Sequence, residues 1–509
     1  MGKFTPRKPQ KPKAPAKKKK EPETFDEFME EALQFEEQGE RYHSGDRSQR
    51  NYERAADMYG KAFEVNNQDA DCVYNWGRVL FLLVNFLPSH ATPEEKLEKL
   101  DQSIEKFRKA LDLEANKTDA QFNLAQALHQ RSEILQDTTE VDNSYAASAM
   151  ALQEAISLFD SVYDLQEKEY LDLNEPDSQQ DMSAPQQDMS APQQEEAEEE
   201  ESKPDNDKQE FTTVTKVEAT TPYSLIETLL STAETMTTMA SMLASFPASM
   251  DLFSKAKAKL GLAEKWLAKI TSTDDEEKKL ARIQINLKEA ATYAAMADRS
   301  FVASSTVDSS LFEKAIERLD EIVEQYDSRH VEAMCDRGDV LTSYGQAIEE
   351  VANKKNLPLV PEKDGKEVWQ LYASATKSFQ SALTLEPKNL RILNKMGDLS
   401  LIRARLELPV AERNRHQLLK NAVFYFKHAV EVDKEVLTSG YLGWAMSEWA
   451  LEEWVEVAGK KEDALKIIRV WIKRGGHGSL FRSLAEDNET WDQEFVEFII
   501  ENFFDDESE

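Results

Sequence analysis

The stretch Ala-Thr-Lys-Ser-Phe-Gln-Ser-Ala at residues 375–382 decides the fold class. Ala375, Phe379 and Ala382 are spaced by four and then three residues, so a helix places their side chains on one face. The small side chains let a neighbouring helix come close, and the ring fills the space between the two helices. The stretch therefore predicts a helix that packs tightly against a partner helix.

The same order of a small, a large apolar and a second small or medium residue recurs along the chain. The further copies are Ala55-Tyr59-Ala62, Ser103-Phe107-Ala110, Ala155-Phe159-Val162, Ala315-Leu319-Ile322 and Ala422-Phe426-Ala429. A recurring pattern of this kind predicts helix pairs that stack and share a continuous core. Apolar residues elsewhere also recur every three or four positions, and no useful length of sequence alternates as a strand does. We therefore expect an all-α protein.

These copies resemble the tetratricopeptide repeat, whose second helix has this small-aromatic-small order. The first helix of that repeat carries a glycine beside apolar residues, as at Gly77 and Gly397, and a proline ends the unit, as at Pro387. The resemblance covers residues 27–170 and, more loosely, 223–434. It implies an α-solenoid of stacked antiparallel helix pairs in two arrays, with a concave surface that binds segments of other proteins.

Composition divides the chain into segments with different expected roles. They are a disordered basic tail (1–24), a first array (25–174), a disordered acidic linker (175–220), a second array (221–436), a Trp-rich C-terminal helical cap (437–504) and an acidic tail (505–509). The linker repeats a proline-containing seven-residue unit and then has six Glu in residues 195–201, a composition that cannot form a core. It is either plain solvated chain or a flexible acidic arm that shields a basic partner.

The chain is strongly acidic, and this bounds its partners. Its 96 Asp and Glu residues outnumber its 62 Lys and Arg residues, which gives a formal net charge of −34. This charge disfavours nucleic acids and anionic membranes, and no apolar stretch is long enough to span a bilayer. Proteins with basic segments are the expected partners.

The N-terminal tail has the opposite sign. Lys17, Lys18, Lys19 and Lys20 lie in a stretch without acidic residues. They form either a nuclear-import signal or part of a solubilising tail that touches RNA. We therefore expect the nucleus, the cytoplasm or both, with nucleic acid bound at most by this tail.

One subset of tetratricopeptide proteins binds the C-terminal carboxylate of heat-shock chaperones through Lys, Asn and Arg side chains on three successive first helices. The aligned positions of this chain are Glu36, Glu40, Asn75, Asp119 and Asn123. Only Asn75 agrees, and carboxylates would repel a C-terminal carboxylate, so heat-shock chaperone C-termini are not expected partners. The same positions predict a groove that attracts Lys- and Arg-rich segments. In the second array, Arg391 and Lys395 are either ordinary surface cations or a remaining cation pair of such a clamp.

Trp449 is the expected contact residue of the C-terminal cap. On a helical wheel it falls outside the apolar face, among Glu452, Glu453 and Glu456. It is either a partly covered surface residue or an aromatic anchor for a cationic side chain of a partner.

The sequence contains no catalytic, nucleotide-binding or metal-binding motif. Its seven His residues lack ligand spacing, and Cys72 and Cys335 lie far apart. We expect no enzyme activity, no cofactor and no metal. One expected function is an interaction scaffold or adaptor, in its sharper form a chaperone or escort for basic clients such as histones or ribosomal proteins. The alternative is a structural component of a translation, protein-import or RNA-processing complex.

Overall fold

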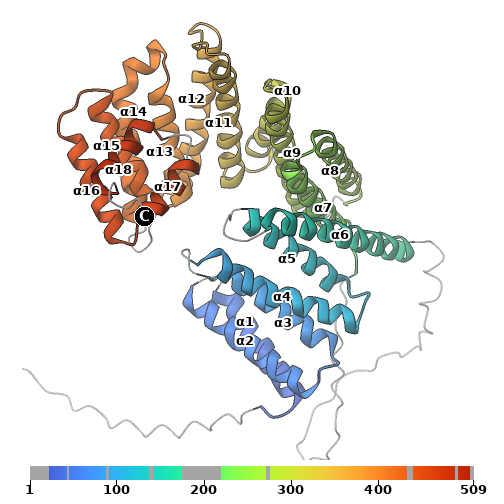
Figure 1. The fold of residues 1–509 in the computed structure, drawn as a ribbon. Coiled ribbons are helices and arrows are strands. Elements are labelled where there is room, and N and C mark those ends of the chain that lie inside the picture. The colour runs from blue at the N-terminus through green and yellow to red at the C-terminus, as the bar shows by residue number, and fades with distance from the viewer. Residues whose placement is uncertain are drawn as a thin grey trace, which may run out of the picture. The chain divides into compact units, whose positions relative to one another are not determined.

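The computed structural model describes residues 22–42, 45–87, 91–136, 143–174, 219–270, 275–432, 440–487 and 491–504. Within these ranges all regular elements are helices, so the predicted all-α class is confirmed (Figure 1). The basic tail with Lys17–Lys20, most of the acidic linker and the acidic C-terminal tail lie outside the described residues. The chain divides into two compact units, Met1–Val141 and Asp142–Glu509.

The first unit contains five described helices in two pairs and a final single helix. They are α1 (Phe25–Tyr42), α2 (Asp46–Val65), α3 (Ala70–Val84), α4 (Pro93–Leu113) and α5 (Thr118–Gln136). Each packs against the next in sequence. Side-chain caps fix where helices begin: Asp69 accepts from the backbone N–H of Cys72 at 2.7 Å, and Thr92 forms a capping box with Glu95. Such a cap stabilises a helix by about 1 kcal/mol.

The elements of the second unit are α6 (Ser144–Asn174), α7 (Pro222–Met242), α8 (Phe246–Leu267), α9 (Asp275–Ser304), α10 (Ser309–Glu321), the π-helical turn η1 (Ile322–Tyr326), α11 (Val331–Lys354), α12 (Asp364–Leu385), α13 (Leu390–Arg405), α14 (Pro409–Val432), α15 (Gly440–Glu453), α16 (Lys460–Lys473), α17 (Gly478–Asp487) and α18 (Gln493–Phe503). Each helix from α6 to α16 packs against the next in sequence. Helix α6 packs on α7, where Ile156 and Tyr163 share a core with Leu225. The compact units therefore place α6 with the second array, whereas the sequence-based boundary places it with the first.

A glycine on the first helix and a ring on the second meet inside several helix pairs, a feature we call the glycine–ring contact. A Cβ atom added to Gly77 would lie 3.0 Å from the ring of Phe107. At Gly338 the corresponding distance to Phe379 is 2.5 Å. The rings are fully buried or nearly so. Two helices can approach this closely only where one of them has no side chain.

The residues predicted to pack between helices are all buried. They are Ala55, Tyr59, Ala62, Phe107, Ala110, Ala155, Phe159, Ala375, Phe379, Ala382, Ala422, Phe426 and Ala429. In α2, however, the ring that meets Gly39 belongs to Tyr52, which lies seven residues, or about two helical turns, before Tyr59. Ser48 stands four residues before Tyr52, and its hydroxyl donates to the Gly39 carbonyl at 2.8 Å.

A buried serine recurs four residues before the ring in other pairs. Ser103 donates to the Gly77 carbonyl at 2.8 Å, and Ser249 donates to the Ala240 carbonyl at 2.5 Å, with Phe253 one turn later. The Ser249-Phe253-Ala256 copy has the four-plus-three spacing but was not among the predicted copies. The hydrogen bond to the neighbouring helix gives the buried serine hydroxyl an acceptor at the point where the two helices touch.

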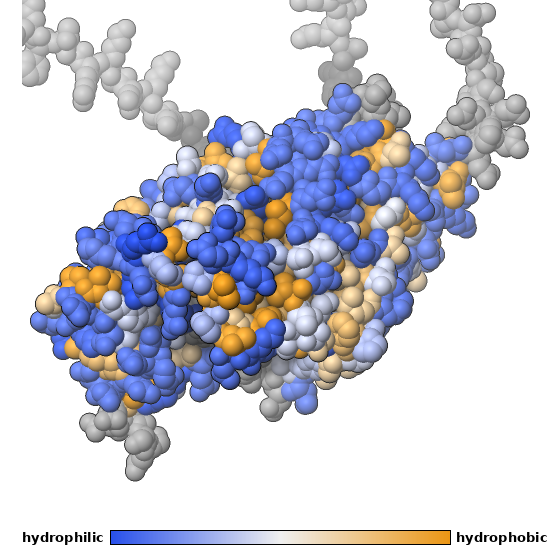
Figure 2. All heavy atoms as spheres, turned by 90° about the horizontal axis from the view of Figure 1, so that it is seen from above, coloured by the Kyte–Doolittle hydropathy of each residue, from blue (hydrophilic) through white to orange (hydrophobic). Residues whose placement is uncertain are grey.

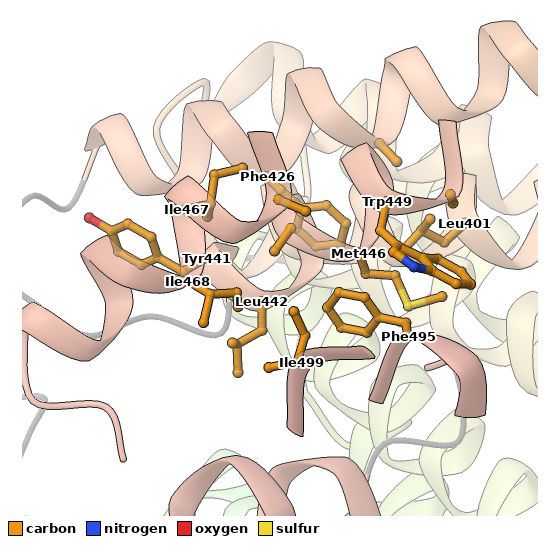
Figure 3. Close-up of a cluster of buried hydrophobic side chains, with 14 of the residues drawn as sticks. Leu401, Phe426, Tyr441, Leu442, Met446, Trp449, Ile467, Ile468, Phe495 and Ile499 are labelled. Carbon is orange, nitrogen blue, oxygen red and sulfur yellow. The ribbon is translucent and has the colours of Figure 1, made fainter. Parts of the chain in front are cut away.

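The C-terminal helices close the second unit around one cluster of buried side chains (Figure 3). Met446 and Phe426 face Phe495 and Ile499 of the last helix in this cluster. Helix α15 is buried from Gly440 almost to its end, and its buried charged side chain, Glu448, pairs with Lys460 of α16. A helix that is buried all round lies inside a core rather than on its surface.

This burial corrects the surface position expected for Trp449. The side chain is 1% exposed, and its ring centroid lies 5.8 Å from that of Phe495. The wheel assumed one apolar face, whereas α15 is surrounded by other helices. The cation over the Trp449 ring is Lys461 of the same chain, 5.7 Å from the centroid.

Candidate functional site

The first helices of the first unit carry the predicted groove residues, and Glu36 is the most buried of them. It is 3% exposed, accepts a hydrogen bond from the Tyr59 hydroxyl at 2.9 Å and forms an ion pair with Arg78 of α3. Burial lowers the pKa of Arg78, and the nearby charge of Asp119 opposes this effect. Glu36 therefore does not offer a free negative charge to a partner, which corrects the expectation for this position.

The other predicted groove residues are more accessible. Glu40 on α1 and Asp119 on α5 are exposed, and Asn75 on α3 is half-buried. The amide of Asn123 donates to the Tyr74 hydroxyl at 2.9 Å, so it links α5 to α3. The face of α1, α3 and α5 thus keeps two exposed carboxylates beside one half-buried cation, Arg78.

Comparisons with known proteins give one family model, one distantly similar sequence and several solved structures. The model of the plant-specific mitochondrial import receptor subunit TOM20 matches residues 46–216. The UPF0656 protein C926.02 of Schizosaccharomyces pombe is 26% identical over 436 residues, which are 81% of this chain and 85% of that protein. Among solved structures, the S. pombe nuclear import adaptor Nro1 has 11% identity and a TM-score of 0.28, over 83% of this chain and 99% of its own. Yeast Tom70 has 14% identity and a TM-score of 0.16, over 86% and 85%.

Stacked helix pairs with glycine–ring contacts are present in both units. Gly77 meets Phe107 in the first, and Gly397 meets Phe426 in the second, where a Cβ added to the glycine would lie 2.6 Å from the ring. The chain has a tetratricopeptide-type fold. In this fold the first helices of successive pairs line the surface that takes up partner segments. In the second unit, α11 and α13 are two such first helices.

Two adjoining hollows lie between α11 and α13 of this tetratricopeptide-type array. The smaller, of about 200 Å³, is lined by Asp339, Lys395 and Asp398 together with the ring of Phe379. The larger, of about 480 Å³, is lined by three glutamates and one arginine among other residues, namely Glu349, Glu350, Glu407 and Arg405. Both include Gln346 and Ile402, so they form one continuous surface, which we call the α11–α13 face.

Lys395, one of the two cations considered for a clamp, is not free to bind a carboxylate. It forms an ion pair with Asp339 of α11, and its ammonium lies 5.8 Å from the ring centroid of Phe379. Arg391, the other cation, is exposed at the start of α13. Lys395 is therefore engaged in an internal salt bridge, and only Arg391 of the two is exposed to solvent.

Two carboxyl groups line the smaller hollow, and Asp339 is paired with Lys395 whereas Asp398 has no such partner among the described residues. Among the described residues it forms no hydrogen bond or ion pair, although it lines the smaller hollow one turn from Lys395. Burial raises the pKa of Asp398 to about 7, and the charge of Lys395 offsets part of the rise. A carboxyl group in this state gains from any cation that enters the hollow.

Other carboxyl groups of α11 are also held away from water. Burial, with a smaller effect of Glu332 and Asp339, raises the pKa of Asp336 to about 6. Burial raises the pKa of Glu349 as well, although the Tyr372 hydroxyl donates to it and Arg405 lies near. The α11–α13 face thus carries several carboxyl groups whose pKa values are raised by burial.

Sequence reasoning missed Asp339, Glu349 and Asp398. The signal that was present is the position of Asp398 directly after Gly397, on a helix already identified as the first of its pair. Spacing within one helix does not indicate which carboxylates line a hollow between α11 and α13, because these two helices are separated in sequence by the whole of α12. In the part of the chain that the structure describes, no three His, Cys, Asp or Glu side chains are placed to hold a metal ion. None of the described helices combines the length and apolarity needed to cross a membrane.

Proposed function

We propose that the chain is a non-catalytic scaffold that holds basic segments of partner proteins on the α11–α13 face. Tetratricopeptide-type arrays are protein-interaction folds, since stacked pairs leave one long surface free. The observation that carries the proposal is the charge of the two hollows, in which carboxylates outnumber cations. The clients would be Lys- and Arg-rich proteins such as histones or ribosomal proteins, escorted in the cytoplasm, the nucleus or both.

Electrostatics supports contacts of this kind more than apolar docking. In the space-filling view, hydrophilic residues predominate and hydrophobic residues form small separate patches (Figure 2). An ion pair at 4 Å contributes about 1 kcal/mol in water and about 4 kcal/mol near a protein surface. Several such pairs, together with the net charge of −34, favour rapid association with a basic segment.

The experiment is affinity purification of the full chain at two salt concentrations, roughly 0.05 M and 0.3 M, followed by mass spectrometry. Salt screens charges beyond about 10 Å at 0.1 M, so basic partners should be recovered at low salt and lost at high salt. A set of partners that does not change with salt, or that is not enriched in basic proteins, would argue against the proposal.

A second candidate is a structural component of a protein-import or related complex. The match of residues 46–216 to the model of a mitochondrial import receptor subunit favours it. Co-sedimentation of the chain in one large complex, at both salt concentrations, would support this alternative over the escort.

The import role of Lys17–Lys20 is a separate part of the proposal. Four consecutive lysines in a proline-containing stretch are typical of an import signal. Deleting residues 1–20 from a fluorescent fusion should reduce its nuclear signal. Unchanged localisation would remove the tail from the proposal.

A further inference from the structure

We propose that the smaller hollow of the α11–α13 face is a binding site for a single lysine or arginine side chain of the partner segment, with Asp398 as the carboxylate that receives its charge. The inference rests on the proposed function and deepens it, because it assigns one site to one chemical group. Three features carry it: the size of the hollow, the nature of its walls and the partners of its charged residues.

Size and walls fit a long basic side chain. A volume of about 200 Å³ is below the roughly 300–1,000 Å³ of small-molecule pockets, so the hollow holds a side chain better than a cofactor. Phe379, Leu399 and Ile402 supply apolar walls, against which the methylene stem of lysine or arginine can lie. Thr342 and Gln346 supply polar groups at the same hollow.

The charges leave one carboxyl group for the ligand. Asp339 already pairs with Lys395, so these two groups neutralise each other. Asp398 remains without a hydrogen bond or ion pair among the described residues, as noted above. A cation that enters the hollow would therefore meet a carboxyl group that has the nearby charge of Lys395 but no hydrogen bond or ion pair in the described chain.

Binding should be linked to protons. The charged groups that line the hollow with Asp398 are Asp339 from α11 and Lys395 from α13, while α12 contributes the uncharged ring of Phe379. Because burial raises the pKa of Asp398 to about 7, the group is only partly ionised at neutral pH. If the ionised form alone binds, affinity should rise by about tenfold from pH 6 to pH 8.

The experiment measures fluorescence anisotropy of a labelled (Gly-Lys)4 peptide with the full chain, beside (Gly-Arg)4 and a fully acetylated (Gly-Lys)4 peptide. Asp398→Asn should weaken binding of the basic peptides by about tenfold, because a hydrogen bond to a charged group is lost. Asp251→Asn is the matched control: it changes the net charge equally, at an exposed position on α8 where the carboxylate pairs with Lys255 one turn later. The control should change affinity by less than twofold, and the acetylated peptide should bind weakly to all variants.

The pH series separates a ligand site from a structural effect. Asp398→Asn should lose the gain in affinity between pH 6 and pH 8 that the wild type and Asp251→Asn retain. Circular dichroism at each pH checks that the variants are folded. If Asp398→Asn binds with wild-type affinity and wild-type pH dependence, the inference is overturned, while the proposed function stands. If the wild type binds no basic peptide at low salt, both are overturned.

Discussion

Replacement of Gly397 by alanine tests the glycine–ring contact directly. The added Cβ would lie 2.6 Å from the Cζ atom of Phe426, closer than side chains approach each other. The ring has little room to move away, because it is 2% exposed and Gly443 of α15 packs on it so closely that a Cβ added there would also lie 2.5 Å from the ring. Overpacking of this severity costs about 3 kcal/mol, and the better helix propensity of alanine returns about 1 kcal/mol. We expect Gly397→Ala to lower the free energy of unfolding by about 2 kcal/mol.

The assay is urea unfolding of the full chain, followed by circular dichroism and by tryptophan fluorescence. Gly261→Ala is the control, because a Cβ at this position in α8 would meet nothing within 4 Å. It should raise stability by about 1 kcal/mol. Phe426→Leu in the Gly397→Ala background removes the outer ring atoms, so the two substitutions together should cost less than their sum. If Gly397→Ala raised the urea midpoint as Gly261→Ala does, the packing argument for the fold would be refuted.

Three other substitutions or modifications probe features of the two units. Arg78→Met should lower stability by about 3 kcal/mol in urea unfolding, because Glu36 stays buried without its cation; an unchanged midpoint would show that Glu36 is solvated. With a thiol reagent at pH 8, half-buried Cys335 should react before Cys72, which is fully covered. Burial raises the pKa of Cys335 to about 11 and that of Cys72 to about 12, so Cys335 also has the larger thiolate fraction. Equal rates would contradict this order. Trp449→Ala should lower stability by about 3–5 kcal/mol, and acrylamide should quench the wild-type Trp449 only weakly; strong quenching would place the indole in solvent.

The sequence predicted the fold because the information for it is local. The four-plus-three spacing within one helix identified Phe107, Phe379 and Phe426 as interhelical residues, and all are buried. In α2 the same local spacing occurs twice. Tyr52 and Tyr59 both follow a small residue by four positions, and only the partner glycine, Gly39, distinguishes them.

The candidate site was harder to predict because it depends on contacts between distant segments. Glu36 is neutralised by a residue 42 positions away, and Asp339 is neutralised by one 56 positions away. An alignment of first helices places such residues on the right surface but cannot show which carboxylates keep their charge. The surface position predicted for Trp449 was wrong for a related reason, since a helical wheel does not record how many helices surround the one that it describes.

Phe426 touches glycines on both of its sides, and this limits how the array can change length. No glycine–ring contact joins α12 to α13 in the described chain. Gain or loss of a whole helix pair at this boundary would therefore leave every ring in contact with its glycine. From α13 to α15 the ring joins three successive helices, and a pair inserted after α14 would uncover one side of it. Lineages that share this fold should therefore differ in repeat number ahead of α13 and keep the order of the segments behind it.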